Sequence, residues 1–177
     1  QAVNWGASEI QLDYIRYSSK QRPSTQNAKD VVAIIEWYKK KLEPQNIPLQ
    51  VDIFGVASYG ESMYIGQNIQ LFSKTVDAIC PMVYPSHYDA GNFDFENPAE
   101  HPYEVVYKTL ENGKEIFIKK EKPFSNIRPW IQDFNLGAIY TPEMIRDQMR
   151  AIKDAGLIRG WMIWNPNNKY REAIFNE

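Results

Sequence analysis

The sequence predicts an α/β fold in which parallel β-strands alternate with α-helices that lie outside the sheet. Strand-like segments recur along the 177 residues, and segments with helical spacing of apolar residues separate them. This alternation is typical of parallel sheets, because a crossover helix usually connects two parallel strands. We identify five βα units and no linker that would divide the chain. We therefore expect a single domain over residues 1–177.

The N-terminal half contains the first three predicted strands. In the strand at 9–15, apolar residues alternate with polar ones, which is the period of a strand. A helix follows at 28–42, between the cap region 23–25 and Pro44. The next elements are a β-rich strand, a weaker helix and a buried strand that contains Pro81, at residues 49–55, 62–74 and 77–84.

The C-terminal half begins with a long loop at 85–100, and loops of this length are often functional. A helix at 102–112 then ends near Gly113. Thr141 and Pro142 are a helix start signal, since a hydroxyl side chain caps the helix and proline suits its first position. The last elements are a strand before this helix, the helix itself as far as Gly156, a final strand and a short helix, at residues 127–134, 141–156, 160–165 and 168–175.

Two sheet architectures fit this order of elements. An open, flavodoxin-like sheet usually binds phosphate groups with a glycine-rich turn after its first strand, but residues 16–23 contain no glycine. A (β/α)8 TIM-type barrel carries its functional groups at the C-terminal strand ends, where Asp13, Tyr84 and Asn165 lie. Such a barrel typically needs about 250 residues. The barrel hypothesis therefore predicts a partial barrel, the C-terminal five βα units, with the first three units absent.

Composition and residue counts exclude several classes of function. Lys and Arg number 20 and Asp and Glu number 22, so the net charge of −2 disfavours nucleic-acid binding. No apolar run of about 18 residues predicts a membrane span. A single cysteine forms no disulfide framework, and the two histidines lack the spacing of zinc ligands, so we expect no metal ion or organic cofactor. Aromatic residues, at 14%, indicate either a large aromatic core or a site that stacks sugar rings.

Five ordered blocks resemble one bacterial family. The blocks are EIQLDYIRY at 9–17, VDIFG at 51–55, DAICPMVYPSHY at 77–88, RPWIQDF at 128–134 and GWMIWN at 160–165. They resemble the uncharacterised putative glycosyl hydrolase domain family, which is expected to form a (β/α)8 barrel distantly similar to the α-amylase clan. The resemblance implies that the blocks are strands four to eight of the barrel.

The resemblance also implies which carboxylates carry catalysis. In amylase-type barrels the nucleophilic Asp lies at the end of strand four, and Asp13 occupies that position. The acid there is usually a Glu at strand five, where this sequence has Asp52, early in its strand. Asp133 is better placed at a strand end and is the first candidate for general acid or base. Glycoside hydrolysis needs one ionised and one protonated carboxyl group, so we predict Asp13 with Asp133, and Asp52 as the alternative acid.

The predicted substrate-binding side chains are aromatic or polar and lie near the strand ends. Sugar rings stack on aromatic faces, and their hydroxyl groups need polar partners. The predicted residues are Arg16, Tyr84, His87, Trp130, Gln132, Trp164 and Asn165. Core packing remains the alternative for the two tryptophans, and a solvated loop position for Arg16.

These residues predict a glycoside hydrolase domain that acts on a polysaccharide or oligosaccharide. The alternatives are a non-catalytic carbohydrate-binding barrel and an open-sheet binding domain. The resemblance implies a secreted or cell-envelope bacterial protein, although no signal peptide is visible and the location stays open. A barrel without its first three strands would expose two sheet edges, so we expect self-association or a need for the missing N-terminal segment.

Overall fold

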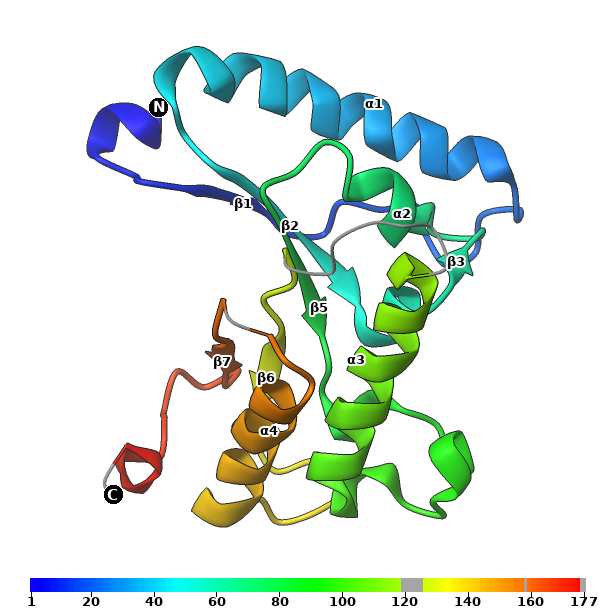
Figure 1. Ribbon diagram of the computed structural model, residues 1–177, viewed down its shortest axis with the longest axis vertical. Coiled ribbons are helices and arrows are strands. Elements are labelled where there is room, and N and C mark those ends of the chain that lie inside the picture. Colours follow the sequence, from blue (N-terminus) through cyan, green and yellow to red (C-terminus); the bar gives the residue numbers. More distant parts are fainter. Residues whose placement is uncertain (119–125, 158, 176–177) are drawn as a thin grey trace. The chain divides into compact units, whose positions relative to one another are not determined.

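The computed structural model describes residues 1–118, 126–157 and 159–175 (Figure 1). Its main sheet has five strands in the order β1-β2-β5-β6-β7. The strands are β1 Ile10–Leu12, β2 Leu49–Phe54, β5 Ala78–Met82, β6 Trp130–Gln132 and β7 Met162–Trp164. β1 pairs with β2, and β6 pairs with both β5 and β7, in parallel. The strand order follows the chain, as in a TIM-type barrel, so the predicted α/β fold with a partial barrel is confirmed.

The chain divides into two compact units, Gln1–Pro81 and Met82–Glu177, and each is described by itself. In the first unit, helix α1 (Thr25–Leu42) lies between β1 and β2 in the chain. Ser24 Oγ accepts a hydrogen bond from the Gln26 N–H at 3.1 Å and so caps the helix start. The apolar face of α1 is buried, through Ala28, Val31, Ile35 and Leu42. The helix predicted at 28–42 is therefore confirmed.

The helix predicted at 62–74 is wrong. The segment contains an antiparallel pair of short strands, β3 (Glu61–Ser62) and β4 (Gln67–Asn68), followed by a helix of four residues, α2 (Ile69–Phe72). Gly66 has φ +72°, a left-handed conformation that reverses the chain before β4. From α1, Asn27 Nδ2 donates to the carbonyl of Met63 at 2.8 Å. A hydrogen bond between segments distant in sequence thus holds a turn that the apolar spacing did not predict.

In the second unit, helix α3 (Pro102–Ile118) packs against helix α4 (Pro142–Asp154), as Figure 1 shows. The prediction that the first of these helices ends near Gly113 is wrong. Gly113 is buried and does not take the left-handed conformation of a helix C-cap, so the helix continues past it. α4 begins as predicted, because Thr141 Oγ1 accepts a hydrogen bond from the Met144 N–H at 3.3 Å.

Irregular segments of the second unit also differ from expectation. The loop predicted at 85–100 contains three short 3-10 helices, Pro85–His87, Asn92–Asp94 and Pro98–Glu100. The C-terminal helix predicted at 168–175 is reduced to one 3-10 turn, Glu172–Ile174. This segment is held instead by side-chain contacts that involve Arg171, which also belong to the candidate site.

Candidate functional site

Polar side chains of the first unit form a hydrogen-bonded ladder across β1, β2 and β5. Gln11 Nε2 donates to a carboxylate oxygen of Asp52, and Gln50 Nε2 donates to Glu9. Cys80 Sγ donates to Gln50 Oε1 at 3.2 Å. Asp52 is 5% exposed and lies inside β2, before the strand end. Its catalytic role stays a prediction, and the carboxylate has a hydrogen-bond partner within the sheet.

Asp13 lies directly after β1, and its carboxylate is exposed. The Tyr14 N–H donates to Asp13 Oδ1 at 2.7 Å. Tyr14 has φ +58°, a conformation that is uncommon for an aromatic residue and that turns the chain immediately after Asp13. Within the described residues, the other carboxylate oxygen makes no hydrogen bond, so it faces solvent at the strand end.

Arg16 packs against aromatic rings. Its guanidinium carbon lies 4.2 Å from the ring centroid of Tyr14 and 5.2 Å from that of Phe54, within cation–π range. Arg16 Nη1 donates to the carbonyl of Tyr17 at 2.9 Å. In the part of the chain that the structure describes, Arg16 makes no ion pair with Asp13. The guanidinium instead lies over the rings of Tyr14 and Phe54, and Tyr14 directly follows Asp13 in the chain.

Asp133 is fully buried and ion-paired with Arg171 in the second unit. The Arg171 guanidinium contacts Asp133 Oδ1, and the Arg171 backbone N–H donates to Oδ2 at 3.0 Å. The Asp133 N–H donates to the carbonyl of Trp164 at 2.9 Å, so the parallel ladder continues past Gln132. Because strand side chains alternate, Asp133 and Gln132 point to opposite faces of the sheet. Both carboxylate oxygens of Asp133 thus have partners from the chain after β7.

Asn165 belongs to the same arrangement. Its Nδ2 donates to the carbonyl of Asp133, and its Oδ1 accepts from the Asn167 N–H at 2.9 Å. Asn165 is 7% exposed, and both ends of its side-chain amide bind the protein's own backbone. Arg171 is the site residue that sequence reasoning missed, since no local pattern pairs it with an acid 38 positions earlier.

Gln132 connects β6 to the turn after β5. Its Nε2 donates to the carbonyl of Phe134 at 2.9 Å, and its Oε1 accepts from the Ser86 N–H at 3.2 Å and from Ser86 Oγ at 2.9 Å. Ser86 Oγ also lies 3.2 Å from His87 Nδ1. The structure therefore brings two predicted binding residues, Gln132 and His87, into one network.

Aromatic rings surround His87. The ring centroids of Tyr84 and Phe134 lie 5.3 Å and 6.0 Å from that of His87. Partial burial against these rings lowers the pKa of His87 below its ordinary value of 6.5, because burial disfavours the charged imidazolium. His87 is therefore neutral at neutral pH, although its ring still reaches solvent.

Trp130 and Trp164 contact each other edge to face, with ring centroids 6.2 Å apart and planes at 84°. Trp164 is 41% exposed at the end of β7. Its open surface is compatible with sugar stacking, whereas Trp130 is only half-exposed.

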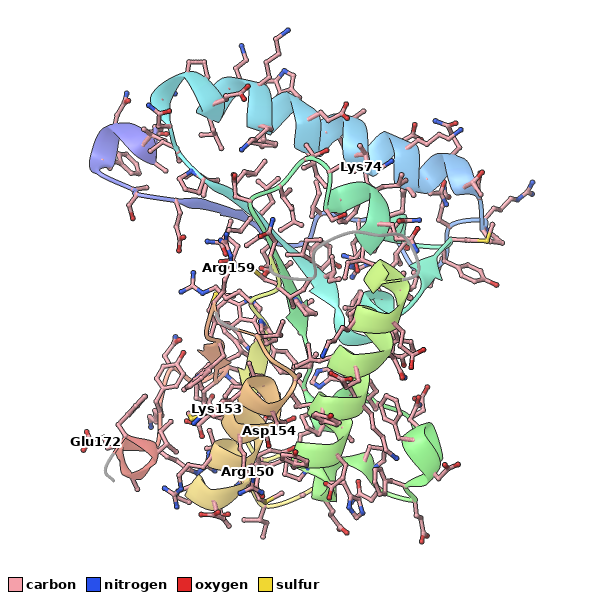
Figure 2. All side chains as sticks on the ribbon, viewed as in Figure 1. Lys74, Arg150, Lys153, Asp154, Arg159 and Glu172 are labelled. Atoms are coloured by element: carbon pink, nitrogen blue, oxygen red, sulfur yellow. The ribbon has the colours of Figure 1, made fainter. Side chains whose placement is uncertain are left out.

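Two hollows lined by described residues contain none of the predicted site residues. One, of about 770 Å³, lies along α4, and its lining includes Arg146, Arg150, Lys153 and Trp161. Figure 2 shows Arg150 and Lys153 on this helix. Arg146 and Arg150 are ion-paired with Glu143 and Asp147 of the same helix. None of the predicted site residues lines this hollow.

Within the described residues, no group of three or more His, Cys, Asp or Glu side chains could hold a metal ion. Nor does this part of the chain include a helix that is both long enough and apolar enough to cross a membrane.

Several solved structures share the fold. The spore cortex-lytic enzyme SleL of Bacillus cereus aligns with a TM-score of 0.64 and 12% identity, over 96% of this chain and 48% of that one. SleL of Bacillus megaterium QM B1551 aligns with a TM-score of 0.62, 12% identity and the same coverage. A chitinase of Chromobacterium violaceum ATCC 12472 aligns with a TM-score of 0.67 and 10% identity, over 98% of this chain and 66% of that one.

At these identities the likeness establishes the fold alone. The chain spans about half the length of the two SleL structures. Among curated proteins, none matches the sequence. The family model described as "Putative glycosyl hydrolase domain" matches residues 1–170, so the chain belongs to that family.

Proposed function

We propose that this domain hydrolyses glycosidic bonds in a polysaccharide or oligosaccharide, with Asp13 as the nucleophile or as the carboxylate that stabilises the oxocarbenium-like transition state. The observation that carries the proposal is the exposed carboxylate of Asp13 at a strand end, in a chain whose family match covers residues 1–170. Barrel enzymes carry their catalytic groups at this edge of the sheet. The fold shared with SleL and a chitinase supports the same class of reaction.

A hydrolase also needs a group that protonates the leaving oxygen. Asp133 is our first candidate and Asp52 the second. Asp133 would have to separate from Arg171 before it could meet a substrate, because both of its oxygens have partners. Asp52 would have to exchange its hydrogen bond to Gln11. An acid role for either residue therefore requires a rearrangement on substrate binding.

The burial of both acid candidates favours a second possible function, a carbohydrate-binding domain without catalysis. Such a domain would use the exposed face of Trp164 and the polar groups near it, and it would need no proton donor. The two functions differ in the expected effect of Asp13→Asn. This change removes the charge and keeps the shape of the side chain, so it abolishes turnover in an enzyme and only weakens binding in a binding domain.

The test uses the full chain with chitin, spore cortex and starch as substrates, and it measures the release of reducing ends. We expect Asp13→Asn to lower the rate at least about 1000-fold, as expected for loss of a nucleophile. Glu36→Gln is the matched control, because Glu36 is an exposed carboxylate on α1. If wild type and Asp13→Asn release reducing ends at the same rate, the catalytic role of Asp13 is wrong. If wild type binds a polysaccharide without cleaving any, the binding function replaces the enzyme.

A further inference from the structure

The side-chain amide of Gln132 has only one possible orientation. Its Nε2 lies 2.9 Å from the carbonyl of Phe134, which can only accept, and its Oε1 lies 3.2 Å from the backbone N–H of Ser86, which can only donate. Exchanging the oxygen and nitrogen would place the amide NH₂ against the Ser86 N–H, donor against donor. It would also place the amide oxygen against the Phe134 carbonyl oxygen, acceptor against acceptor. Gln132 is fully buried, so water cannot replace either partner.

The orientation of Gln132 determines the hydrogen positions of the next two groups. Ser86 Oγ lies 2.9 Å from Gln132 Oε1 and has one hydrogen, which it donates to that oxygen. The contact of 3.2 Å between Ser86 Oγ and His87 Nδ1 then needs its hydrogen from the imidazole. Neutral His87 therefore carries its proton on Nδ1, and Nε2 has a free lone pair.

The environment of His87 preserves this state. The ring's side-chain hydrogen bond is with Ser86 and its aromatic contacts are with Tyr84 and Phe134, and none of these three side chains is charged at neutral pH. The two aromatic rings restrict the orientation of the imidazole, and the turn hydrogen bond from the His87 N–H to the carbonyl of Tyr84, at 2.9 Å, holds its backbone. His87 is nevertheless an exposed residue, so an external donor can approach it.

We propose that His87 Nε2 is a fixed hydrogen-bond acceptor for a hydroxyl group of a bound carbohydrate, and that Gln132 and Ser86 are positioning residues that set its tautomer. The sugar as ligand rests on the proposed function, whereas the tautomer depends on protein groups alone. The half-buried ring of Phe134 offers apolar surface to the C–H face of a sugar, whereas Tyr84, which is 7% exposed, packs against the imidazole from within the core. The imidazole adds the polar contact that orients the sugar, and apolar surface with one placed polar group is typical of small-ligand sites.

The first measurement is the tautomer of His87, by ¹⁵N NMR of the 177-residue chain at about pH 8, well above the ordinary histidine pKa. The chain has two histidines, so His101→Gln leaves a single imidazole to assign. We expect wild-type His87 to carry its proton on Nδ1. Ser86→Ala removes the acceptor and shifts the proton towards Nε2, and Ser86→Thr, which keeps a hydroxyl, restores the wild-type signal. A proton on Nε2 in wild type would overturn the proposal.

The second measurement is the affinity for chitotetraose, soluble starch oligosaccharides and solubilised spore cortex, by titration calorimetry. Loss of one neutral hydrogen bond weakens binding by about threefold to tenfold, so we expect this loss for Ser86→Ala and for His87→Phe. Ser86→Thr and His101→Gln should bind as wild type does. Circular dichroism verifies that each variant is folded.

The outcomes separate the two proposals. If wild type binds a carbohydrate and both Ser86→Ala and His87→Phe bind it equally well, the role of His87 is wrong and the proposed function stands. If wild type binds none of the three carbohydrates, the carbohydrate role of His87 is wrong and the proposed function loses its support. A tautomer shift in Ser86→Ala with parallel loss of affinity supports both.

Discussion

The ion pair between Asp133 and Arg171 predicts an unequal response to two substitutions. Arg171→Met removes the guanidinium and leaves a carboxylate that is fully buried. Removing one partner of a buried ion pair costs about 3–5 kcal/mol of unfolding free energy. The Arg171 side chain is 27% exposed, so partial access to water places the expected loss near the lower end, at about 3 kcal/mol.

The reverse change should cost less. Asp133→Asn leaves Arg171, which can reach water, and the asparagine oxygen can still accept from the Arg171 N–H. The expected loss is that of a charge-assisted hydrogen bond, about 1.5–3 kcal/mol. Arg150→Met is the matched control, since Arg150 pairs with Asp147 at 2.6 Å but its side chain is 56% exposed. Exposed ion pairs contribute less than about 1 kcal/mol.

Urea unfolding followed by tryptophan fluorescence measures all three variants, because the chain contains five tryptophans. Equal losses for Arg171→Met and Arg150→Met would refute the view that burial of Asp133 makes its pair costly to break. The same variants test catalysis. If Asp133 only anchors the chain after β7, Asp133→Asn loses activity in proportion to its unfolded fraction, whereas loss from a fully folded variant indicates the predicted acid.

Two further predictions concern backbone conformation and pH. An alanine Cβ at Gly66, where φ is +72°, would lie 2.6 Å from the Asn27 carbonyl oxygen, whereas Gly156, at φ +78°, has no atom within 4 Å of such a Cβ. Alanine at either position loses about 1–2 kcal/mol of unfolding free energy, because the backbone is left-handed there. Gly66→Ala should lose about 1–3 kcal/mol more, because the new Cβ meets the Asn27 carbonyl. Thermal unfolding measures both variants, and equal losses would contradict the contact at Gly66. Burial lowers the pKa of His87 below 6.5, so the imidazole binds a proton more readily in the unfolded chain than in the folded one. The stability contributed by neutral His87 is therefore present above pH 6.5 and is lost as the pH falls below it. His87→Gln should reduce the slope of unfolding free energy against pH in that range, and an unchanged slope would contradict the assignment.

Local spacing along the chain determined most of the elements. Period-2 alternation identified β1, and the cap signals at Ser24 and Thr141 marked the starts of α1 and α4. These features were predictable because each depends on residues a few positions apart, where chain geometry is nearly fixed. The predicted strand at 9–15 runs past Asp13, whereas β1 ends at Leu12, so only the structure places Asp13 directly after the strand.

Tertiary contacts decided the elements that were predicted wrongly. The segment at 62–74 has helical spacing, but Asn27 binds its backbone and Gly66 reverses it into β4. Glycine often ends a helix, yet Gly113 is buried in the second unit and α3 continues past it. At 62–74, a long-range contact outweighs a local preference of about 1 kcal/mol or less.

The candidate site shows the same division. The sequence by itself determined which polar and aromatic residues stand near the strand ends, because period and order along the chain set those positions. Only the tertiary structure decided which of them have partners: Arg171 pairs with Asp133, Gln11 binds Asp52, and Gln132 orients Ser86. Hydrogen bonds between residues tens of positions apart depend on strand register and on where loops return, and neither is encoded in the spacing of neighbouring residues.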